Sequence, residues 1–402
     1  MTISAKIQEK MINNFSFKIL SKDKKSNART GEIQARHGKI LTPAFVPVGT
    51  AASVKSLTPE DLQEIGISVF FVNTYHMLFR PGVKTIKKMG GLHQFTHWPN
   101  PIMTDSGGFQ AFSLGENGPK NSDTKEKNLV EITNEGIYFK SVWNGEKVFL
   151  NPEKSIKAQK DLDSDIMMSF DECTFYPISK KRAYEAMERT HDWALRSLKA
   201  AKEKFPRKQA LYGIVQGSVF PDLRKKSADF ISRLPFDGLA IGSVANSREP
   251  REKVFAVLDW TMPFLLRTNK PIHFLGIGEI EDLFLSIEKG IDTLDCVTPT
   301  RLGRMGWVFS QKAGLKNRFR FDITKTTFQS DQKPLEEGCQ CYTCQNYSRS
   351  YLNHLFRSRE LLAYRLASIH NLFFFENLMK NVRQSIEQNQ FLKLKKKWLG
   401  YD

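Results

Sequence analysis

Long hydrophobic runs are missing from this 402-residue sequence. No stretch approaches the roughly 20 apolar residues that a helix needs to cross a bilayer, and the N-terminal segment mixes charged and apolar side chains without the apolar core of a secretory signal. Cysteine is also scarce: the five cysteines are an odd number, and three of them lie within six residues of each other. We therefore expect no disulfide framework, but a cytoplasmic protein with free or metal-bound thiols.

Acidic residues are too few to balance the basic ones. There are 60 Lys and Arg against 43 Asp and Glu, a net charge of +17. Such an excess indicates a polyanionic partner, either nucleic acid or an acidic membrane surface. The composition favours nucleic acid, and we expect no membrane association. The alternative is a basic surface that serves only solubility.

Short apolar runs alternate with amphipathic stretches from about residue 42 onward. Several runs are almost continuously apolar, as in strands that are buried on both faces. The expected strands are 42–49, 68–73, 101–105, 165–171, 210–217, 238–243, 271–278 and 291–297, and the expected helices are 179–205, 221–234, 251–266 and 280–290. This rhythm predicts an α/β fold, the (β/α)8 TIM barrel. A doubly wound open sheet is the alternative, but no G-x-G-x-x-G turn follows the first strand.

The barrel pattern has one interruption and two flanking segments. Residues 129–150 are typical of β-hairpins, with turns at NEG and NG, and predict a β-hairpin insertion. A long helical run at 346–389 follows the cysteine cluster. The expected division is an N-terminal extension (1–30), a catalytic barrel (31–325) and a zinc-binding helical subdomain with a basic tail (326–402).

Polar residues stand at the carboxyl ends of several expected strands. They are Asp105, Asp171, Gln216, Ser243 and Asp295. In a barrel these ends meet on one face, where active sites are found. A single Asp more often caps a helix or closes a turn, but carboxylates from separate strands favour a site. One carboxylate can attack a sugar carbon while another moves protons.

A further carboxylate could recognise a purine. Guanine presents two N–H donors beside one carbonyl, so an ionised Asp accepts both donors while Gln donates to the carbonyl. Asp171 and Gln216 fit this pattern. Phe109 could stack on the base, although a core aromatic at the barrel rim is an equal alternative. Gly107 and Gly108 allow a ligand to approach the backbone closely, or form a plain turn.

The C-x-C-x2-C cluster at Cys339, Cys341 and Cys344 is the second strong signal. Three thiolates and one imidazole make a closed tetrahedral set that is typical of structural zinc. His354 and His370 both follow, so the fourth ligand stays open. The two solitary cysteines are expected to be small buried residues, because no His motif accompanies either of them. These are Cys173 and Cys296.

Several segments resemble the queuine/tRNA-guanine transglycosylase family of bacterial type, over residues 30 to about 375. They are TPAFVPVGTAASVKSLTP, NTYHMLFRPG, IMTDSGGFQAFSL, FDEC, GIVQGSVF, LDCVTPTRLGRMG, CQCYTC and IHNLFFF. The resemblance implies a homodimeric barrel enzyme with one structural Zn²⁺ per chain. Such an enzyme exchanges the wobble guanine of GUN-anticodon tRNAs for a 7-deazaguanine (7-aminomethyl-7-deazaguanine or queuine) through a covalent aspartyl-ribosyl intermediate, in queuosine biosynthesis.

The resemblance also assigns roles to individual residues. Asp295 matches the family's nucleophile and Asp105 its general acid/base, while His370 joins the three clustered cysteines as a zinc ligand. The purine-binding positions match Ser106, Phe109, Asp171, Gln216, Gly242, Ser243 and Leu275. The positions that hold tRNA match Arg301, Arg304 and Lys55.

The sequence departs from the family pattern in two places. The loop at 243–250 reads SVANSREP, one residue longer than the usual GLSVGEP-like loop that contacts the 7-substituent of the incoming base, which makes a preference for queuine a hypothesis. Glu279 stands where a Lys is more usual. Two rival functions are a catalytically silent tRNA-binding subunit, against which the presence of Asp105 and Asp295 argues, and base exchange in another nucleic acid.

Overall fold

The structure, a computed structural model, describes residues 15–110, 130–141, 145–202, 208–242 and 249–401. The chain forms two compact units. The first unit comprises the segment up to Phe17, Gln34–Lys39 and Phe71–His273, and the second comprises Lys18–Ile33, Ile40–Phe70 and Phe274–Asp402. Each unit therefore contains segments that are far apart in the sequence, and the two are described separately below.

Eight strands form one sheet in the order β4-β14-β13-β12-β11-β10-β6-β5. Their bounds are β4 Ala44–Pro47, β5 Phe70–Val72, β6 Ile102–Thr104, β10 Ile166–Met168, β11 Ala210–Val215, β12 Gly238–Ile241, β13 Ile272–Phe274 and β14 Thr293–Cys296. The pairs β6–β10, β10–β11, β11–β12 and β14–β4 are parallel. The consecutive strands β4 and β5 stand at the two ends of this order, as in a barrel opened along one seam. The predicted (β/α)8 barrel is confirmed, and a doubly wound sheet, which places its first strand inside the order, is excluded.

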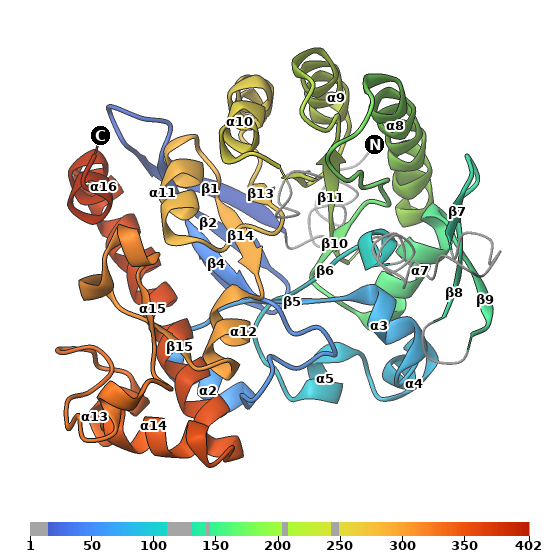
Figure 1. Ribbon diagram of the computed structural model, residues 1–402. Helices are drawn as coiled ribbons and strands as arrows, with labels where there is room; N and C mark the ends of the chain where they lie inside the picture. Colours follow the sequence, from blue (N-terminus) through green and yellow to red (C-terminus); the bar gives the residue numbers. More distant parts are fainter. Residues whose placement is uncertain (1–14, 111–129, 142–144, 203–207, 243–248, 402) are drawn as a thin grey trace, which may run out of the picture. The chain divides into compact units, whose positions relative to one another are not determined.

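Helices alternate with these strands as predicted. The larger ones are α7 Pro152–Leu162, α8 Lys180–Lys202, α9 Pro221–Arg233, α10 Arg251–Leu265 and α11 Ile280–Glu288, and the shorter ones are α2 Pro59–Ile65, α3 Thr74–Phe79, α4 Val83–Lys88, α5 Leu92–Thr96 and α12 Thr298–Arg304. In the first unit α8, α9 and α10 stand side by side (Figure 1). Local chemistry sets where two of them begin: the Asn151 side chain caps α7, and Pro221 occupies the first turn of α9.

The hairpin insertion is confirmed in the first unit. Strands β7 (Val130–Ile132), β8 (Ile137–Lys140) and β9 (Lys147–Leu150) form an antiparallel sheet. The buried face of this sheet packs on the aromatic side chains of the unit's interior, Tyr75 and Trp193.

A three-stranded sheet near the N-terminus was not predicted. It consists of β1 (Ser16–Lys22), β2 (Arg29–Ala35) and β3 (Gly38–Thr42). Exposed positions of β1, among them Lys18 and Lys22, alternate with half-buried ones such as Phe17 and Ile19. A buried ion pair of 2.6 Å between Arg29 and Asp292 ties β2 to the loop before β14.

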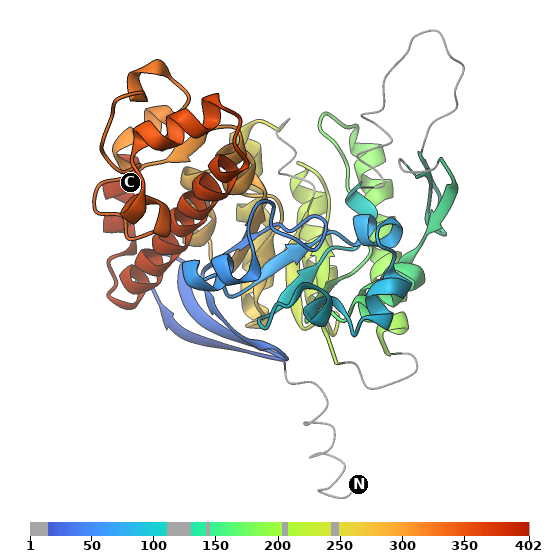
Figure 2. The same cartoon turned by 90° about the horizontal axis from the view of Figure 1, so that it is seen from below.

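The C-terminal part of the second unit is mostly helical. It contains the antiparallel pair β15 (Trp307–Phe309) and β16 (Arg320–Asp322), then α13 Tyr342–Asn346, α14 Arg349–Arg357, α15 Leu361–Glu387 and α16 Phe391–Leu399. Figure 2 shows these helices in orange and red, gathered beside one another. The predicted helical run is broken at Arg359, whose φ is 58°, and the basic tail forms a helix. Among the described residues, no helix is both long and apolar enough to span a bilayer.

Candidate functional site

Asp105 follows the last residue of β6 in the first unit. Its Oδ1 accepts hydrogen bonds from the backbone N–H groups of Thr74 (2.7 Å) and Gly107 (3.1 Å), and its Oδ2 accepts one from Asn73 Nδ2 (2.6 Å). Burial raises the pKa of Asp105 above its usual value, although these hydrogen bonds oppose the shift. A carboxyl group that is fixed in place and has a raised pKa can give and take a proton.

Asp171 lies three residues beyond β10 and is hydrogen-bonded to two other predicted site residues. Its Oδ1 accepts from Ser106 Oγ at 3.2 Å, and its Oδ2 accepts from Gln216 Nε2 at 2.7 Å. Burial, with a smaller contribution from the charges of Asp105 and Glu172, raises the pKa of Asp171 to about 6. The structure therefore brings Ser106, Asp171 and Gln216 together, and Asp171 stays ionised at neutral pH.

Gln216 is fixed by hydrogen bonds, but one polar atom of its side chain has no hydrogen-bond partner in the described part of the chain. Its backbone N–H donates to Ser227 Oγ (3.1 Å), while its buried Oε1 has no hydrogen-bond partner among the described residues. A buried amide oxygen without a partner is costly, so it indicates a place where a ligand's donor can bind. Gly242 lies against this amide, because a Cβ atom there would come within 2.7 Å of Gln216 Nε2.

The other three residues predicted to surround the purine are Phe109, Ser243 and Leu275. Phe109 is 38% exposed, so it is not a core aromatic and is accessible to a ligand. Ser243, like most of the 243–250 loop, lies outside the described residues. Leu275 belongs to the second unit, directly after β13, where it is half-buried.

Asp295 is the third residue of β14 in the second unit and is 9% exposed. Its Oδ1 accepts a hydrogen bond of 3.0 Å from the backbone N–H of Gly276, in the loop after β13. The side chain is therefore oriented by a neighbouring strand end and does not cap a helix. Position 276 has a φ of 83°, a conformation that favours glycine.

The two solitary cysteines differ in how far they are buried. Burial raises the pKa of Cys296, whose Sγ contacts Thr298 Oγ1 at 3.0 Å. Cys173 is buried in the loop after β10. Cys173 is thus a small buried residue, as expected, whereas Cys296 is half-buried and its raised pKa makes it a poor nucleophile.

The predicted tRNA contacts all lie in the second unit. Arg301 and Arg304 share one face of α12; Arg301 is exposed, whereas Arg304 is half-buried and donates to the carbonyl of Thr300 (2.8 Å). Lys55 is exposed in the loop before α2. Glu279 pairs with Arg320 at 3.2 Å, which gives the unusual acidic residue a partner.

Cys339, Cys341, Cys344 and His370 come together as a group that could hold a metal ion. His370 Nδ1 lies 3.9, 3.5 and 3.3 Å from the three sulfur atoms in that order, close to the roughly 3.6 Å between ligands of a tetrahedral zinc site. His370 Nε2 donates to the carbonyl of Phe309 at 2.8 Å, which turns Nδ1 towards the sulfurs. His354 is not part of the group, so the structure resolves the choice between the two histidines.

A second titratable cluster was not predicted. His37, at the β2–β3 turn, and His93, in α5, each contact one oxygen of Asp165, at 2.9 and 3.0 Å. The backbone N–H groups of His37 and Ile102 donate to the same carboxylate, so four nitrogen atoms surround its two oxygens. The two imidazoles stack 3.6 Å apart, so a metal between them could not lie in the plane of both rings. We interpret this cluster as a clasp that joins three segments of the first unit.

Two other arrangements were invisible in the sequence. Arg224 of α9 is completely buried and donates to three backbone carbonyls, those of Ser218, Val215 and Gly242. It thereby links the ends of β11 and β12, beside Gln216. Glu172, next to Asp171, is buried between Arg182 and Arg189. A single charged residue inside an amphipathic helix carries no sequence signal that distinguishes these roles from surface positions.

These observations define a (β/α)8-barrel enzyme with carboxylates at its strand ends and a Cys₃His cluster near its C-terminus. Residues 23–401 match the model of a family described as queuine tRNA-ribosyltransferase. A queuine tRNA-ribosyltransferase of Thermoanaerobacter sp. (strain X514) is 44% identical over 382 residues, 95% of this chain and 96% of the relative. A relative of the same name from Psychrobacter sp. (strain PRwf-1) is 43% identical, and the match covers 91% of this chain and 91% of the relative. Another, from Francisella tularensis subsp. novicida (strain U112), is 42% identical, and the match covers 94% of this chain and 96% of the relative. The chain belongs to the queuine tRNA-ribosyltransferase family.

Proposed function

We propose that this protein exchanges the wobble guanine of GUN-anticodon tRNAs for a 7-deazaguanine by double displacement, in queuosine biosynthesis. The observation that carries the proposal is the hydrogen-bonded array of Ser106, Asp171 and Gln216. An ionised carboxylate can accept the two donors on the edge of guanine, and the second N–H of the Gln216 amide, whose first N–H donates to Asp171, can donate to the carbonyl. A 7-deazaguanine has the same edge, so one site can take the leaving and the incoming base in turn.

Asp295 is the proposed nucleophile. One carboxylate oxygen attacks C1′ of the target ribose and forms the C1′–O bond, while the electrons of the glycosidic bond move to the guanine nitrogen. The hydrogen bond from Gly276 keeps the carboxylate in one orientation before the attack. The product of this step is a covalent aspartyl-ribosyl intermediate and a free guanine that takes up a proton.

Asp105 is the proposed proton carrier. With its raised pKa it can protonate the leaving guanine and then remove a proton from the nitrogen of the incoming base. That nitrogen attacks C1′, the C1′–O bond to Asp295 breaks, and both carboxylates return to their starting states. Ser106, Phe109, Gln216, Gly242, Ser243 and Leu275 are proposed to surround the base.

The metal of the Cys₃His group is proposed to be Zn²⁺ in a structural role. All four ligand positions are occupied by protein atoms, so no position is open to substrate. We further propose that Arg301, Arg304 and Lys55 contact tRNA, that the chain acts as a cytoplasmic homodimer, and that 31–325 is the catalytic barrel with 326–402 as the zinc-binding subdomain.

Release of labelled guanine from tRNA tests the function. Wild-type protein should release it when 7-aminomethyl-7-deazaguanine or queuine is added, and a denaturing gel should show a protein–tRNA adduct. Asp295→Ala should still bind tRNA but form no adduct and release no guanine. Equal release by wild type and variant would rule out the proposed mechanism, and a comparison of the two bases identifies the preferred one.

A further inference from the structure

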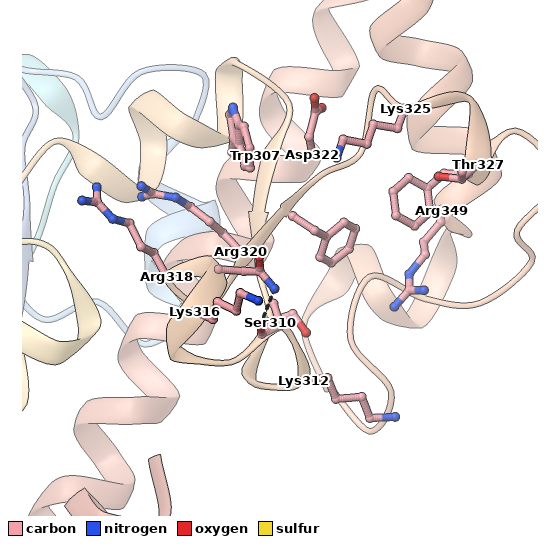
Figure 3. A pocket seen from close by; sticks show the side chains of 14 residues that line it. Trp307, Ser310, Lys312, Lys316, Arg318, Arg320, Asp322, Lys325, Thr327 and Arg349 are labelled. Atoms are coloured by element: carbon pink, nitrogen blue, oxygen red, sulfur yellow. Dashed lines mark hydrogen bonds between the residues drawn. The ribbon is translucent and has the colours of Figure 1, made fainter. Parts of the chain in front are cut away.

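The second unit contains a basic and aromatic cavity that no step of the proposed reaction uses. It has a volume of about 910 Å³ and lies beside β15, β16 and the loop between them (Figure 3). Six basic side chains line it, against one acidic side chain, that of Asp322. The basic residues are Lys312, Lys316, Arg318, Arg320, Lys325 and Arg349.

The loop between the two strands presents some of these cations on a fixed backbone. It contains two 3-10 turns, Gln311–Ala313 and Leu315–Asn317. Arg318 and Phe319 then both adopt left-handed conformations, with φ of 51° and 54°, which side-chain-bearing residues rarely adopt. Phe319 is buried, with its ring 5.4 Å from that of Trp398, and this anchor leaves the Arg318 side chain 68% exposed.

Half of the cations are neutralised by neighbouring carboxylates. The pairs are Lys312 with Glu337, Arg320 with Glu279 (3.2 Å) and Arg349 with Asp331 (3.0 Å). These pairs fix the walls of the cavity. In particular, Arg349 is held over the rings of Phe321 and Phe328, 5.1 and 5.8 Å from their centres.

Among the residues that the structure describes, the other three cationic side chains have little or no negative charge close enough to neutralise them. In the described part of the chain no carboxylate lies within ion-pair distance of the exposed Lys316 and Lys325, and Arg318 has only a distant contact of 3.8 Å to Glu279. Such excess positive charge in one cavity attracts an anion. The volume far exceeds that of a single phosphate, and aromatic side chains beside cations are the composition of surfaces that follow an RNA chain.

We propose that this cavity binds the sugar–phosphate backbone of the RNA substrate, at phosphates outside the exchanged nucleotide. The inference rests on the proposed function, which makes the substrate a polyanion. The position of the cavity also supports RNA binding, because β15 begins at Trp307, three residues after Arg304 of α12. The cavity thus continues the predicted tRNA contacts along the chain within the same unit.

The double variant Lys316→Glu/Lys325→Glu tests this site in the full-length protein. Its matched control is Lys18→Glu/Lys22→Glu, which makes the same charge change at two exposed positions of β1. Binding of unmodified tRNA is measured by fluorescence anisotropy across a series of KCl concentrations. We expect the cavity variant to bind at least about 10-fold more weakly and its plot of log Kd against log salt to be shallower by roughly two, because two phosphate contacts are lost. The control should change Kd less than about threefold and keep the wild-type slope.

Three outcomes would overturn the inference. They are an unchanged Kd and slope in the cavity variant, an equal effect in both variants, and a change in oligomeric state by light scattering, which would assign the cavity to a second copy of the chain. Metal content and melting temperature equal to wild type exclude misfolding. An assay of guanine release separates the two proposals. If wild type exchanges guanine and the KM of the cavity variant for tRNA does not rise, only the proposed RNA-binding role of the cavity is contradicted. If the variant binds tRNA more weakly but wild type exchanges no guanine, only the proposed reaction is contradicted.

Discussion

Asp171 is charged at neutral pH at a cost to the stability of the fold. Its pKa is raised to about 6 by burial and by neighbouring carboxylates, so the folded protein binds a proton more tightly than the unfolded chain does. Stability therefore falls as pH rises from about 4 to about 6. A shift of about two pKa units corresponds to roughly 3 kcal/mol at most. This cost is what the proposed function requires, because only the ionised form can accept both donors of guanine.

Asp171→Asn removes the cost of burying a charged carboxylate, and it also removes the charged acceptor for the donors of guanine. We expect the variant to be more stable than wild type by about 1–3 kcal/mol at pH 7.5, and by less than about 1 kcal/mol at pH 4. Urea unfolding at several pH values measures the difference. The KM for the incoming base should rise at least about 30-fold, since hydrogen bonds to a charged group are worth about 1.5–3 kcal/mol each.

The control for this prediction is Asp192→Asn, a change at an exposed position of α8. It should alter neither the pH dependence of stability nor the KM for the base. A stability gain in Asp171→Asn that is independent of pH would contradict the assignment, because it would show that the carboxylate is not titrating between pH 4 and pH 6.

At the scale of elements, the Asp165 clasp holds together the β2–β3 turn, α5 and the first residue of β6. Burial opposes the charge of Asp165, but hydrogen bonds from His37, His93 and the Ile102 backbone outweigh it and hold its pKa well below the usual range. Stabilisation by such a carboxylate is present above its unfolded pKa and is lost as pH falls through the lower folded value.

Asp165→Asn should therefore destabilise the protein by about 2–4 kcal/mol at pH 7. The loss should shrink below about pH 4, because there the unfolded chain takes up a proton at this carboxylate while folded wild type still keeps it ionised. Chemical denaturation at pH 7 and pH 3.5 measures both values. Tight binding of Co²⁺ or Zn²⁺ by Cys341→Ala protein at the histidines would instead show that the cluster is a metal site, against our interpretation.

The Cys₃His group joins the segment that leads into α13, residues 339–344, to α15 and packs beside an apolar cluster that includes Leu352 and Leu366. Without a metal, three thiols, two of them buried, and a buried imidazole would lack their common partner. Cys341→Ala, or removal of the metal by a chelator, should lower the melting temperature and abolish zinc content by atomic absorption. His354→Ala keeps all four ligands and should retain one equivalent of zinc. Full zinc content in Cys341→Ala would contradict the ligand set.

The elements themselves were largely predictable, and their contacts were not. Apolar runs such as 210–217 identify strands because a strand buried on both faces tolerates few polar side chains. Residues at strand ends, such as Asp171, were found for the same reason: polarity directly after an apolar run is visible in one dimension. Asn73 and Arg224 were missed as partners, since a hydrogen bond between segments depends on packing that no local pattern encodes. The choice of His370 likewise needed either the family resemblance or the three-dimensional arrangement of the side chains.

For the whole molecule, the path of the chain determines how it can unfold. The chain passes between the two units five times, near residues 17, 33, 39, 70 and 273. Neither unit is a continuous segment, so neither can lose its structure without releasing segments that are covalently bound to the other. Separate domains connected by a single linker would unfold independently. Here the topology favours a single cooperative transition, even though the chain is long.

We therefore expect one calorimetric peak whose calorimetric and van't Hoff enthalpies agree. Asp165→Asn lies in the first unit and Cys341→Ala in the second, and each should move this whole peak to lower temperature without splitting it. Their effects on the free energy of unfolding should add within about 0.5 kcal/mol, because the sites share no partner. Two resolved peaks, of which each substitution shifts only one, would show instead that the units unfold separately despite the five crossings.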